Sequence, residues 1–417
     1  MRVSRMRSWS TTTAYAPRRW VRDGSTTDAP SQIESGHVQE LLIESSTMSA
    51  LEPLPVTTSP TKERVAYLDN ARYWVMLLVV IGHSLTQFTD MDSARGVYVW
   101  IYSFHMPFFI LISGYTARRY MGDARQVRRI VSTLVVPYLL VETSLQLITR
   151  HYTGEPSPLL LLSPQWLAWF LAALFVWRLT TPIWRALRYP ITTSILISLL
   201  VGLIEVPNVL ALPKILGFLP FYVVGLHMTR ERFERLADPR IRAASVAVLG
   251  SALLICYTYS KNWQIDWLLW KQRYDEDPLG ATAIEGMSQR AELLAIGFLL
   301  TFAALSLVPR RRSITTALGG RTFYCYLLHG YLIIFLKLQF DLFDDMSRFG
   351  FAAVVATTFA ALVVANLLMT KPVSVVFRPV FEPKLTWLFR DIPKPSPTTP
   401  SAGQTPEPTG KRPAGTP

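Results

Sequence analysis

Long apolar stretches, separated by short polar and basic segments, recur along most of the 417-residue chain. A helix needs about 20 apolar residues to cross the hydrocarbon core of a bilayer, and many of these stretches approach that length. The pattern predicts an all-α membrane protein, a polytopic bundle of about ten transmembrane helices. The expected spans are residues 69–89, 97–117, 130–149, 163–182, 190–207, 213–229, 242–260, 289–308, 315–337 and 350–370.

The two ends of the chain have a different composition. Residues 1–63 are rich in Ser, Thr, Pro and Arg and contain no apolar core of a signal peptide, and residues 376–417 are rich in Pro and Thr. Such segments cannot bury enough apolar surface to fold. We expect a disordered cytoplasmic leader, in which Met48 is an alternative start, and a disordered cytoplasmic tail around one membrane domain at 64–375.

Composition and charge narrow the class of protein further. Half of the residues are hydrophobic and 17% are charged, which argues against an ordinary soluble multidomain enzyme. The net charge of +13 does not indicate nucleic acid binding, because the basic residues lie between apolar stretches and form no single stripe. The leader and every second loop carry the excess of Lys and Arg. The positive-inside rule therefore predicts a multi-pass plasma-membrane protein with both termini in the cytoplasm.

Ionisable side chains at membrane depth are costly, so those in the expected spans are the first candidates for function. The first span contains Arg72 and His83, eleven positions apart. At about 100° per residue this spacing is three turns plus roughly 20°, so both side chains share one helix face, about 16 Å apart along the axis. Arg72 then lies near the cytoplasmic interface, and His83 lies in the outer half. Alternatively, Arg72 reaches lipid headgroups and His83 bonds a neighbouring helix.

Two further histidines are expected at the depth of His83. His105 lies in the inward-running second span and His329 in the outward-running ninth. Each is then roughly 18–21 Å from the inner face of a core about 30 Å thick. Glu205, in the fifth span, either joins the outer side of such a cavity or marks the exit of a short helix.

Clustered histidines suit two kinds of chemistry. A neutral imidazole can take the proton of an acceptor hydroxyl or accept an acyl group itself, while a nearby cation holds an anionic donor. Metal binding is the competing use, but no His-x-x-x-His or Glu-x-x-His spacing supports it, and we expect no metal. The only cysteines, Cys256 and Cys325, lie inside apolar stretches, which argues against a disulfide framework, a zinc site or a thiol catalyst.

These residues resemble those of the acyltransferase-3 family of integral membrane O-acyltransferases, particularly its fucose 4-O-acetylase-like branch. Arg72 and His83 match the family's arginine, ten intervening residues and histidine, and Asp69 also fits the pattern. The segment 102–115 resembles the family's Phe-His-Met-Pro followed by Phe-Phe-x-x-Ser-Gly, with Ile110 in place of a Phe.

Three later segments continue the resemblance, which covers about residues 67–375. They are the basic Arg125–Arg129 loop with Pro137-Tyr138, the sequence Trp169-Phe170-Leu171, and the segment Thr322–His329 ending in Tyr-Leu-Leu-His. Each also has an ordinary reading. The basic loop can be a positive-inside anchor, Trp169 can be a packing residue, and Ser113-Gly114 can merely allow close helix approach.

The resemblance implies transfer of an acyl group, acetyl in the first place, from cytoplasmic acetyl-CoA or another acyl-CoA to an extracytoplasmic carbohydrate or glycolipid. It implies that His83 is the catalytic base or acyl carrier and that Arg72 contacts the donor. It further implies that Arg125, Arg128, Arg129 and Ser113 help to bind the coenzyme, and that Asp69, His105, Glu205 and His329 support the site or the acceptor. Some members carry a fused extracytoplasmic domain that completes transfer; we expect none here, so either the membrane domain itself or a separate partner protein completes the reaction.

Two other function classes stay open. A transporter or flippase for a glycolipid or sugar precursor also places His, Arg and Glu inside a helical bundle, although no paired broken helices or repeated halves are evident. A catalytically inactive scaffold would tolerate loss of Arg72 or His83. The outside loop at about 261–288, acidic and aromatic between Trp267 and Asp277, either shapes an acceptor entrance or is a solvated cap.

Overall fold

The computed structural model describes residues 61–154, 159–340, 342–385 and 387–389. These residues belong to one compact unit of the chain. They are helical throughout, with no strand in the described ranges, which confirms the predicted all-α class. The predicted leader up to residue 60, the tail from 390 and the internal start at Met48 lie outside the described residues.

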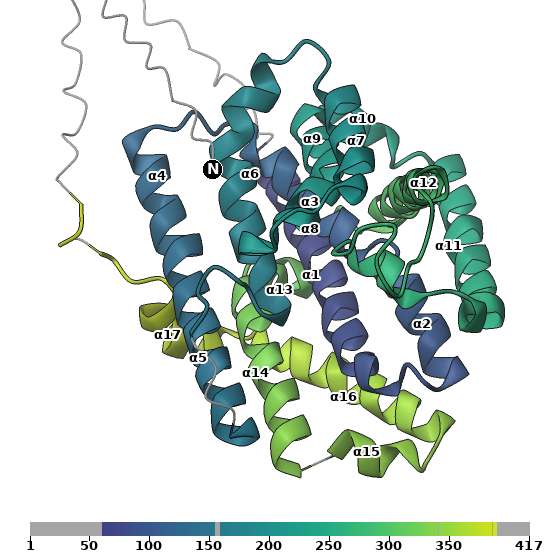
Figure 1. Ribbon diagram of the computed structural model, residues 1–417. Helices are drawn as coiled ribbons and strands as arrows, with labels where there is room; N and C mark the ends of the chain where they lie inside the picture. The colour runs from purple at the N-terminus through teal and green to yellow at the C-terminus, as the bar shows by residue number, and fades with distance from the viewer. Residues whose placement is uncertain (1–60, 155–158, 341, 386, 390–417) are drawn as a thin grey trace, which may run out of the picture. The chain divides into compact units, whose positions relative to one another are not determined.

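The first half of the unit supplies the helices that later frame the candidate site (Figure 1). Their bounds are α1 Thr61–Leu85, η1 Thr86–Phe88, α2 Asp92–Tyr102, α3 His105–Ala117, α4 Ala124–Ile130, the π-helical turn η2 Val131–Val135, α5 Val136–Thr153, η3 Trp166–Ala168, α6 Trp169–Ala186, α7 Pro190–Leu200 and η4 Val201–Leu203.

The second half adds the remaining helices around them. Their bounds are η5 Val209–Ala211, α8 Leu212–Gly217, α9 Leu219–His227, α10 Arg230–Arg235, α11 Pro239–Tyr259, η6 Ser260–Asn262, η7 Ile265–Leu269, α12 Ala283–Leu307, α13 Ile314–Gly319, α14 Thr322–Phe340, α15 Leu342–Ser347, α16 Phe351–Leu368 and α17 Lys371–Phe381. Helix α17 crosses the predicted boundary at 375, and Glu382 just beyond it accepts a hydrogen bond from Tyr324 at 2.8 Å.

Seven helical segments of the described chain are long and apolar enough to cross a membrane, or eight if a bent pair counts as one span. The sequence pattern predicted about ten. Seven predicted spans correspond to these segments, and the eighth, 213–229, corresponds to the pair Val209–Gly217 and Leu219–His227, which bends by 61°. Pro220 follows this break and has no backbone N–H to continue the preceding helix, which explains the bend.

The two other predicted spans differ from the seven for separate reasons. The segment at 190–207 forms only a short apolar helix, Pro190–Leu203. The segment at 69–89 lies in α1. This helix is long enough to cross a membrane but is not apolar enough, because it carries Asp69, Asn70, Arg72 and His83.

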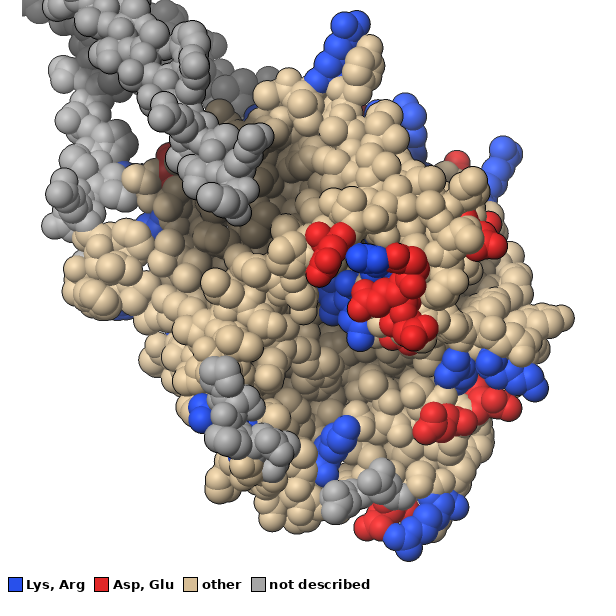
Figure 2. Space-filling model, viewed as in Figure 1, with Lys and Arg blue, Asp and Glu red and all other residues tan. Residues whose placement is uncertain are grey.

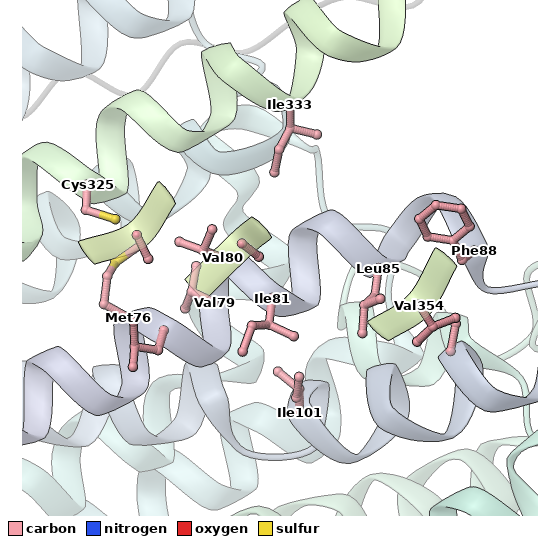
Figure 3. Packing of buried hydrophobic residues seen from close by; sticks show 14 of the residues in the cluster. Met76, Val79, Val80, Ile81, Leu85, Phe88, Ile101, Cys325, Ile333 and Val354 are labelled. Atoms are coloured by element: carbon pink, nitrogen blue, oxygen red, sulfur yellow. The ribbon is translucent and has the colours of Figure 1, made fainter. Parts of the chain in front are cut away.

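Helix α1 compensates for its polar composition by lying inside the bundle. It packs against α2, α3, α13, α14 and α16 (Figure 1). Figure 3 shows apolar side chains of α1, among them Met76, Val80 and Leu85, packed against Ile101, Cys325 and Val354 of neighbouring helices. A helix surrounded by protein does not need a lipid-like surface, so α1 can carry the polar residues that the lipid-facing helices exclude.

Helices α3 and α9 approach each other very closely. A Cβ atom on Gly114 would lie 2.1 Å from the carbonyl oxygen of Tyr222, and one on Gly225 would lie 2.0 Å from that of Leu111. Gly114 therefore serves helix packing, as one reading of the Ser113-Gly114 pair predicted. The hydroxyl of Ser113 donates to the Phe109 carbonyl of its own helix at 2.8 Å.

The connection between α11 and α12 is not a solvated cap. Trp267, Trp270 and Tyr274 are buried in it. Tyr274 fits against two glycines so tightly that a Cβ on Gly202 or Gly286 would lie within 2.3 Å of its ring. Burial also raises the pKa of the Tyr274 hydroxyl. This connection is a packed part of the fold.

Candidate active site

The three histidines that the sequence placed at one depth come together in the structure. The Nδ1 atom of His83 on α1 lies 2.9 Å from the Nε2 atom of His329 on α14. The two rings stack with centroids 5.2 Å apart, and the ring of His105 on α3 stands edge-on to His83 at 6.4 Å. His105 and His329 are buried, while His83 is partly accessible. Three helices thus deliver one imidazole cluster.

Hydrogen bonding fixes the direction of the protons in this cluster. The Nδ1 atom of His329 lies 2.9 Å from the Cys325 carbonyl oxygen, which can only accept, so this nitrogen carries the proton. In a neutral His329 the Nε2 atom then accepts, and the proton between the rings belongs to Nδ1 of His83. The Nε2 atom of His83 is left with its lone pair free to act as a base.

Two aromatic residues complete the walls around His83. The Trp166 ring lies 5.1 Å from the His83 ring, and the Trp166 backbone has a φ of 37°, a strained value for a non-glycine residue. The Tyr102 ring packs against His105 at 4.6 Å. His105 itself donates through Nδ1 to the Ile101 carbonyl oxygen at 2.9 Å, which fixes its ring.

Arg72 is held midway along α1. Its guanidinium forms a salt bridge of 2.7 Å with Asp69 one turn earlier, and the Arg72 side chain stays 34% exposed. The neighbouring Asn70 is fully buried. Its amide donates to the carbonyl oxygens of Pro309 and Arg311, and its oxygen accepts from the hydroxyls of Thr315 and Thr316, all within 3.0 Å. Asn70 therefore fixes the middle of α1 against α13 and the loop before it, which positions the Asp69–Arg72 pair.

The comparisons with known proteins agree with this constellation. Residues 65–369 match the family model described as an acyltransferase domain of the acyltransferase-3 type. The chain belongs to the acyltransferase-3 family. Nodulation protein NolL of Sinorhizobium fredii is similar to it, with 25% identity over 335 residues that cover 73% of this chain and 88% of NolL. No solved structure matches. The protein is therefore a membrane acyltransferase, and its chemistry requires an acyl donor.

The predicted basic loop of this acyltransferase lies on α4, where the spacing of Arg125, Arg128 and Arg129 places them on one helix face. Arg125 and Arg129 are exposed. Arg128 donates to the Lys384 carbonyl oxygen at 3.3 Å, and its guanidinium lies 5.3 Å from the centre of the Phe389 ring. A fourth arginine, Arg178 of α6, lies within electrostatic range of both Arg129 and Arg72. Its Nε atom is buried and has no hydrogen-bond partner in the described part of the chain.

Glu205 lies apart from the histidine cluster, in a pocket of about 360 Å³ that contains the residues after α7 and the connection before α12. Arg273, Glu276 and Arg290 line the same pocket. Figure 2 shows acidic and basic side chains gathered next to the start of α12, on a face that is otherwise largely uncharged. Within this connection the guanidinium of Arg273 contacts the carboxyl of Asp275 at 2.5 Å and lowers its pKa.

Sequence reasoning missed several residues of the site. Trp166 was read only as part of a span, although an aromatic residue at the start of a span is a usable signal. Arg178 and Lys214 were passed over, although both are cations within expected spans. Lys214 stands over the Trp169 ring at 5.1 Å. Among the described residues, no group of three or more His, Cys, Asp or Glu is placed to hold a metal ion.

Proposed function

We propose that the protein transfers an acetyl group from cytoplasmic acetyl-CoA to a hydroxyl of an extracytoplasmic carbohydrate or glycolipid. The observation that carries this proposal is the Cys325–His329–His83 hydrogen-bond chain, which leaves Nε2 of His83 as a free base. Family membership supports acyl transfer, and the resemblance to the fucose 4-O-acetylase-like branch supports a carbohydrate hydroxyl.

In the proposed reaction, Nε2 of His83 takes the proton of the acceptor hydroxyl as its oxygen attacks the thioester carbonyl. The new bond joins that oxygen to the acyl carbon, and the bond from this carbon to sulfur breaks. The leaving thiolate of coenzyme A receives the proton from His83. His329 holds the reactive tautomer of His83 and stabilises the positive charge that forms on it.

The donor approaches from the cytoplasmic end of α1 in this mechanism. Arg72 lies about 16 Å below His83 on the same helix face, so it can hold a distant anionic part of the coenzyme while the thioester reaches the imidazole. Arg178 adds a cation on this side whose Nε–H group is buried and has no hydrogen-bond partner among the described residues. Arg125, Arg128, Arg129 and Ser113 have more peripheral roles, because they are exposed or bonded to backbone carbonyls.

The proposed topology has ten spans and cytoplasmic termini. Eight segments of the described chain are long and apolar enough to cross a membrane when the bent pair counts as one span. Adding α1 and the short helix Pro190–Leu203 gives ten spans, an even number that places both termini on one side. The excess of Lys and Arg in the leader and alternate loops supports the orientation. Glu205 and its pocket then lie on the acceptor side.

The test is transfer of radiolabelled acetyl from acetyl-CoA to envelope carbohydrate in membrane vesicles. His83→Ala is expected to lower incorporation by about 10²- to 10⁴-fold because the base is lost. Arg72→Ala is expected to raise the KM for acetyl-CoA. Label that stays on the wild-type protein in the absence of acceptor would indicate an acyl-histidine intermediate instead of base catalysis.

The variants are compared at matched expression levels. Leu254→Ala, at an exposed position on α11, is the control and should transfer acetyl like the wild type. Equal labelling by all variants would refute the assigned site. Movement of unmodified glycolipid across the vesicle membrane, without release of coenzyme A, would instead identify a transporter.

A further inference from the structure

A large groove opens between α2, α11 and α12, and none of the three clustered histidines lines it. Its volume is about 1080 Å³. One wall consists of small and apolar side chains of α11, including Val248, Ala252 and Ile255. Helix α11 lies at the margin of the bundle in Figure 1, and only 11% of its most apolar segment is buried. The groove therefore faces the lipid.

The opposite wall, on α12, is polar over the first turns of the helix and apolar beyond them, where Leu293, Ile296, Leu299 and Leu300 line the groove. Glu285, Gln289 and Glu292 line the groove, and their spacing of four and then three residues places them in one stripe along the helix. Glu285 has a structural role, since its carboxylate and the Thr282 hydroxyl form the capping box that starts α12. Gln289 and Glu292 have no such role. Neither forms a side-chain hydrogen bond or ion pair with any described residue.

Glu292 is the unusual member of this stripe. It lies three residues after the start of the expected span at 289–308, roughly 4.5 Å along the helix axis into it. At this level the span meets the polar headgroups, so the unpaired, exposed carboxylate can accept hydrogen bonds from a polar group of a ligand in the groove.

The inner end of the groove is lined by neighbours in sequence of the candidate active site. Val99 and Ser103 line that end, at the break between α2 and α3. His105 follows this break directly, and Tyr102, within it, lies 4.6 Å from His105 and 6.3 Å from His83 between ring centroids. A molecule in the groove thus lies beside the helix ends that carry the histidine cluster.

We propose that this groove admits the acceptor from the membrane as a glycolipid, with its lipid chain along α11 and its sugar along the polar stripe of α12. The inference rests on the proposed function for the reaction, and it narrows the acceptor from carbohydrates in general to a lipid-anchored one.

Charge complementarity selects this occupant. Sugar hydroxyls donate hydrogen bonds to the carboxylate of Glu292 and to the amide oxygen of Gln289. No Lys, Arg or His lines the groove in the described part of the chain, so a phospholipid phosphate would have no cation to pair with and would meet two carboxylates. The headgroup of the ligand inside the groove is therefore rich in hydroxyls and uncharged.

The experiment is native mass spectrometry of the purified protein, released from membranes with its bound lipid, combined with the acetyl-transfer assay. Ala252→Trp fills the groove, and Leu254→Trp places the same side chain on an exposed part of α11 outside it. Wild type and Leu254→Trp should retain a hexose-containing lipid, and Ala252→Trp should lose it. Glu292→Gln keeps the volume and loses the charge, and it should lower glycolipid retention at least tenfold.

Transfer in native membranes gives the second readout. Labelled acetyl should appear in the organic-solvent extract, and Ala252→Trp should abolish it without changing the KM for acetyl-CoA. Three outcomes would overturn the proposal. The wild-type protein could retain phospholipid alone, the two tryptophan variants could behave alike, or Ala252→Trp could convert a dimer to a monomer. If the protein retains glycolipid but transfer does not depend on His83, the assignment of the groove stands and the proposed function is refuted.

Discussion

Helices α1 and α11 show two opposite ways of placing a helix in this membrane protein. Helix α11 is apolar along its length and largely exposed, with Val246, Leu254 and Tyr257 facing outward. Helix α1 carries Asp69, Asn70, Arg72 and His83 and is less apolar than the other membrane-spanning helices. It is enclosed by five other helices.

The difference shows where a membrane enzyme can keep polar chemistry. Lipid offers no hydrogen bonds, so a lipid-facing helix is selected for apolar side chains. A helix enclosed by protein obtains partners from its neighbours, as His83 does from His329 and Asn70 does from α13 and the loop before it. Paired substitutions on the two kinds of helix test this contrast.

The largest effect is expected for His329→Phe, which keeps a ring in place but removes the acceptor for Nδ1 of His83. Without it, His83 is no longer held in the tautomer with a free Nε2 atom, and kcat should fall about 1000-fold. Acetyl-transfer kinetics across pH measure this change. Tyr257→Phe on α11 should leave kcat unaltered, and an unchanged pH profile in His329→Phe would contradict the proton relay.

The next effect is expected for Asn70→Leu. The change leaves two carbonyl oxygens and two threonine hydroxyls without their partner, and it should destabilise the protein by about 3 kcal/mol. Thermal unfolding in detergent measures the loss. The control is Thr258→Ala on α11, whose exposed hydroxyl bonds only its own helix, and it should shift stability by less than about 0.5 kcal/mol. Equal shifts in both variants would remove the structural role given to Asn70.

A smaller effect is expected for Gly319→Ala, because the new Cβ would lie 1.9 Å from the Asp69 carbonyl oxygen and would push α13 away from α1. The cost should be about 2 kcal/mol. Gly250→Ala on α11 meets no atom within 4 Å and should be neutral or stabilising, since alanine favours a helix. The same unfolding measurement compares the two, and a stable Gly319→Ala variant would show that the helices separate without cost.

The smallest effect is expected for Arg178→Met on the donor side. Loss of one charged hydrogen-bond donor to a phosphate should raise the KM for acetyl-CoA about tenfold and leave kcat nearly constant. Arg242→Met, at the exposed start of α11, should change neither constant. A fall in kcat with KM unaltered would mean that Arg178 acts on the reaction itself and not on donor binding.

Much of the fold could be predicted from the sequence. The apolar stretches gave the all-α class and the approximate position of most spans. The periodicity of one helix placed Arg72 and His83 on one face, and residue counting placed His83, His105 and His329 at one depth. These properties depend only on distance along a helix axis, which the chain order fixes. Length and apolarity alone do not give the number of spans, because Pro220 bends one span into two short helices and the polar residues of α1 lower its apolarity.

The tertiary structure alone decided which faces of the helices meet. His83 and His329 are 246 positions apart, and only the rotation of α1 against α14 brings their ring nitrogens to 2.9 Å. The same packing brings Arg178 near Arg72 and seats Trp166 over His83, and it leaves Glu292 unpaired in the groove beside α11. Periodicity fixes the direction of a side chain relative to its own helix. The partner of that side chain depends on how neighbouring helices pack, which is decided by contacts distant in sequence, such as Gly114 against Tyr222 and Gly319 against Asp69.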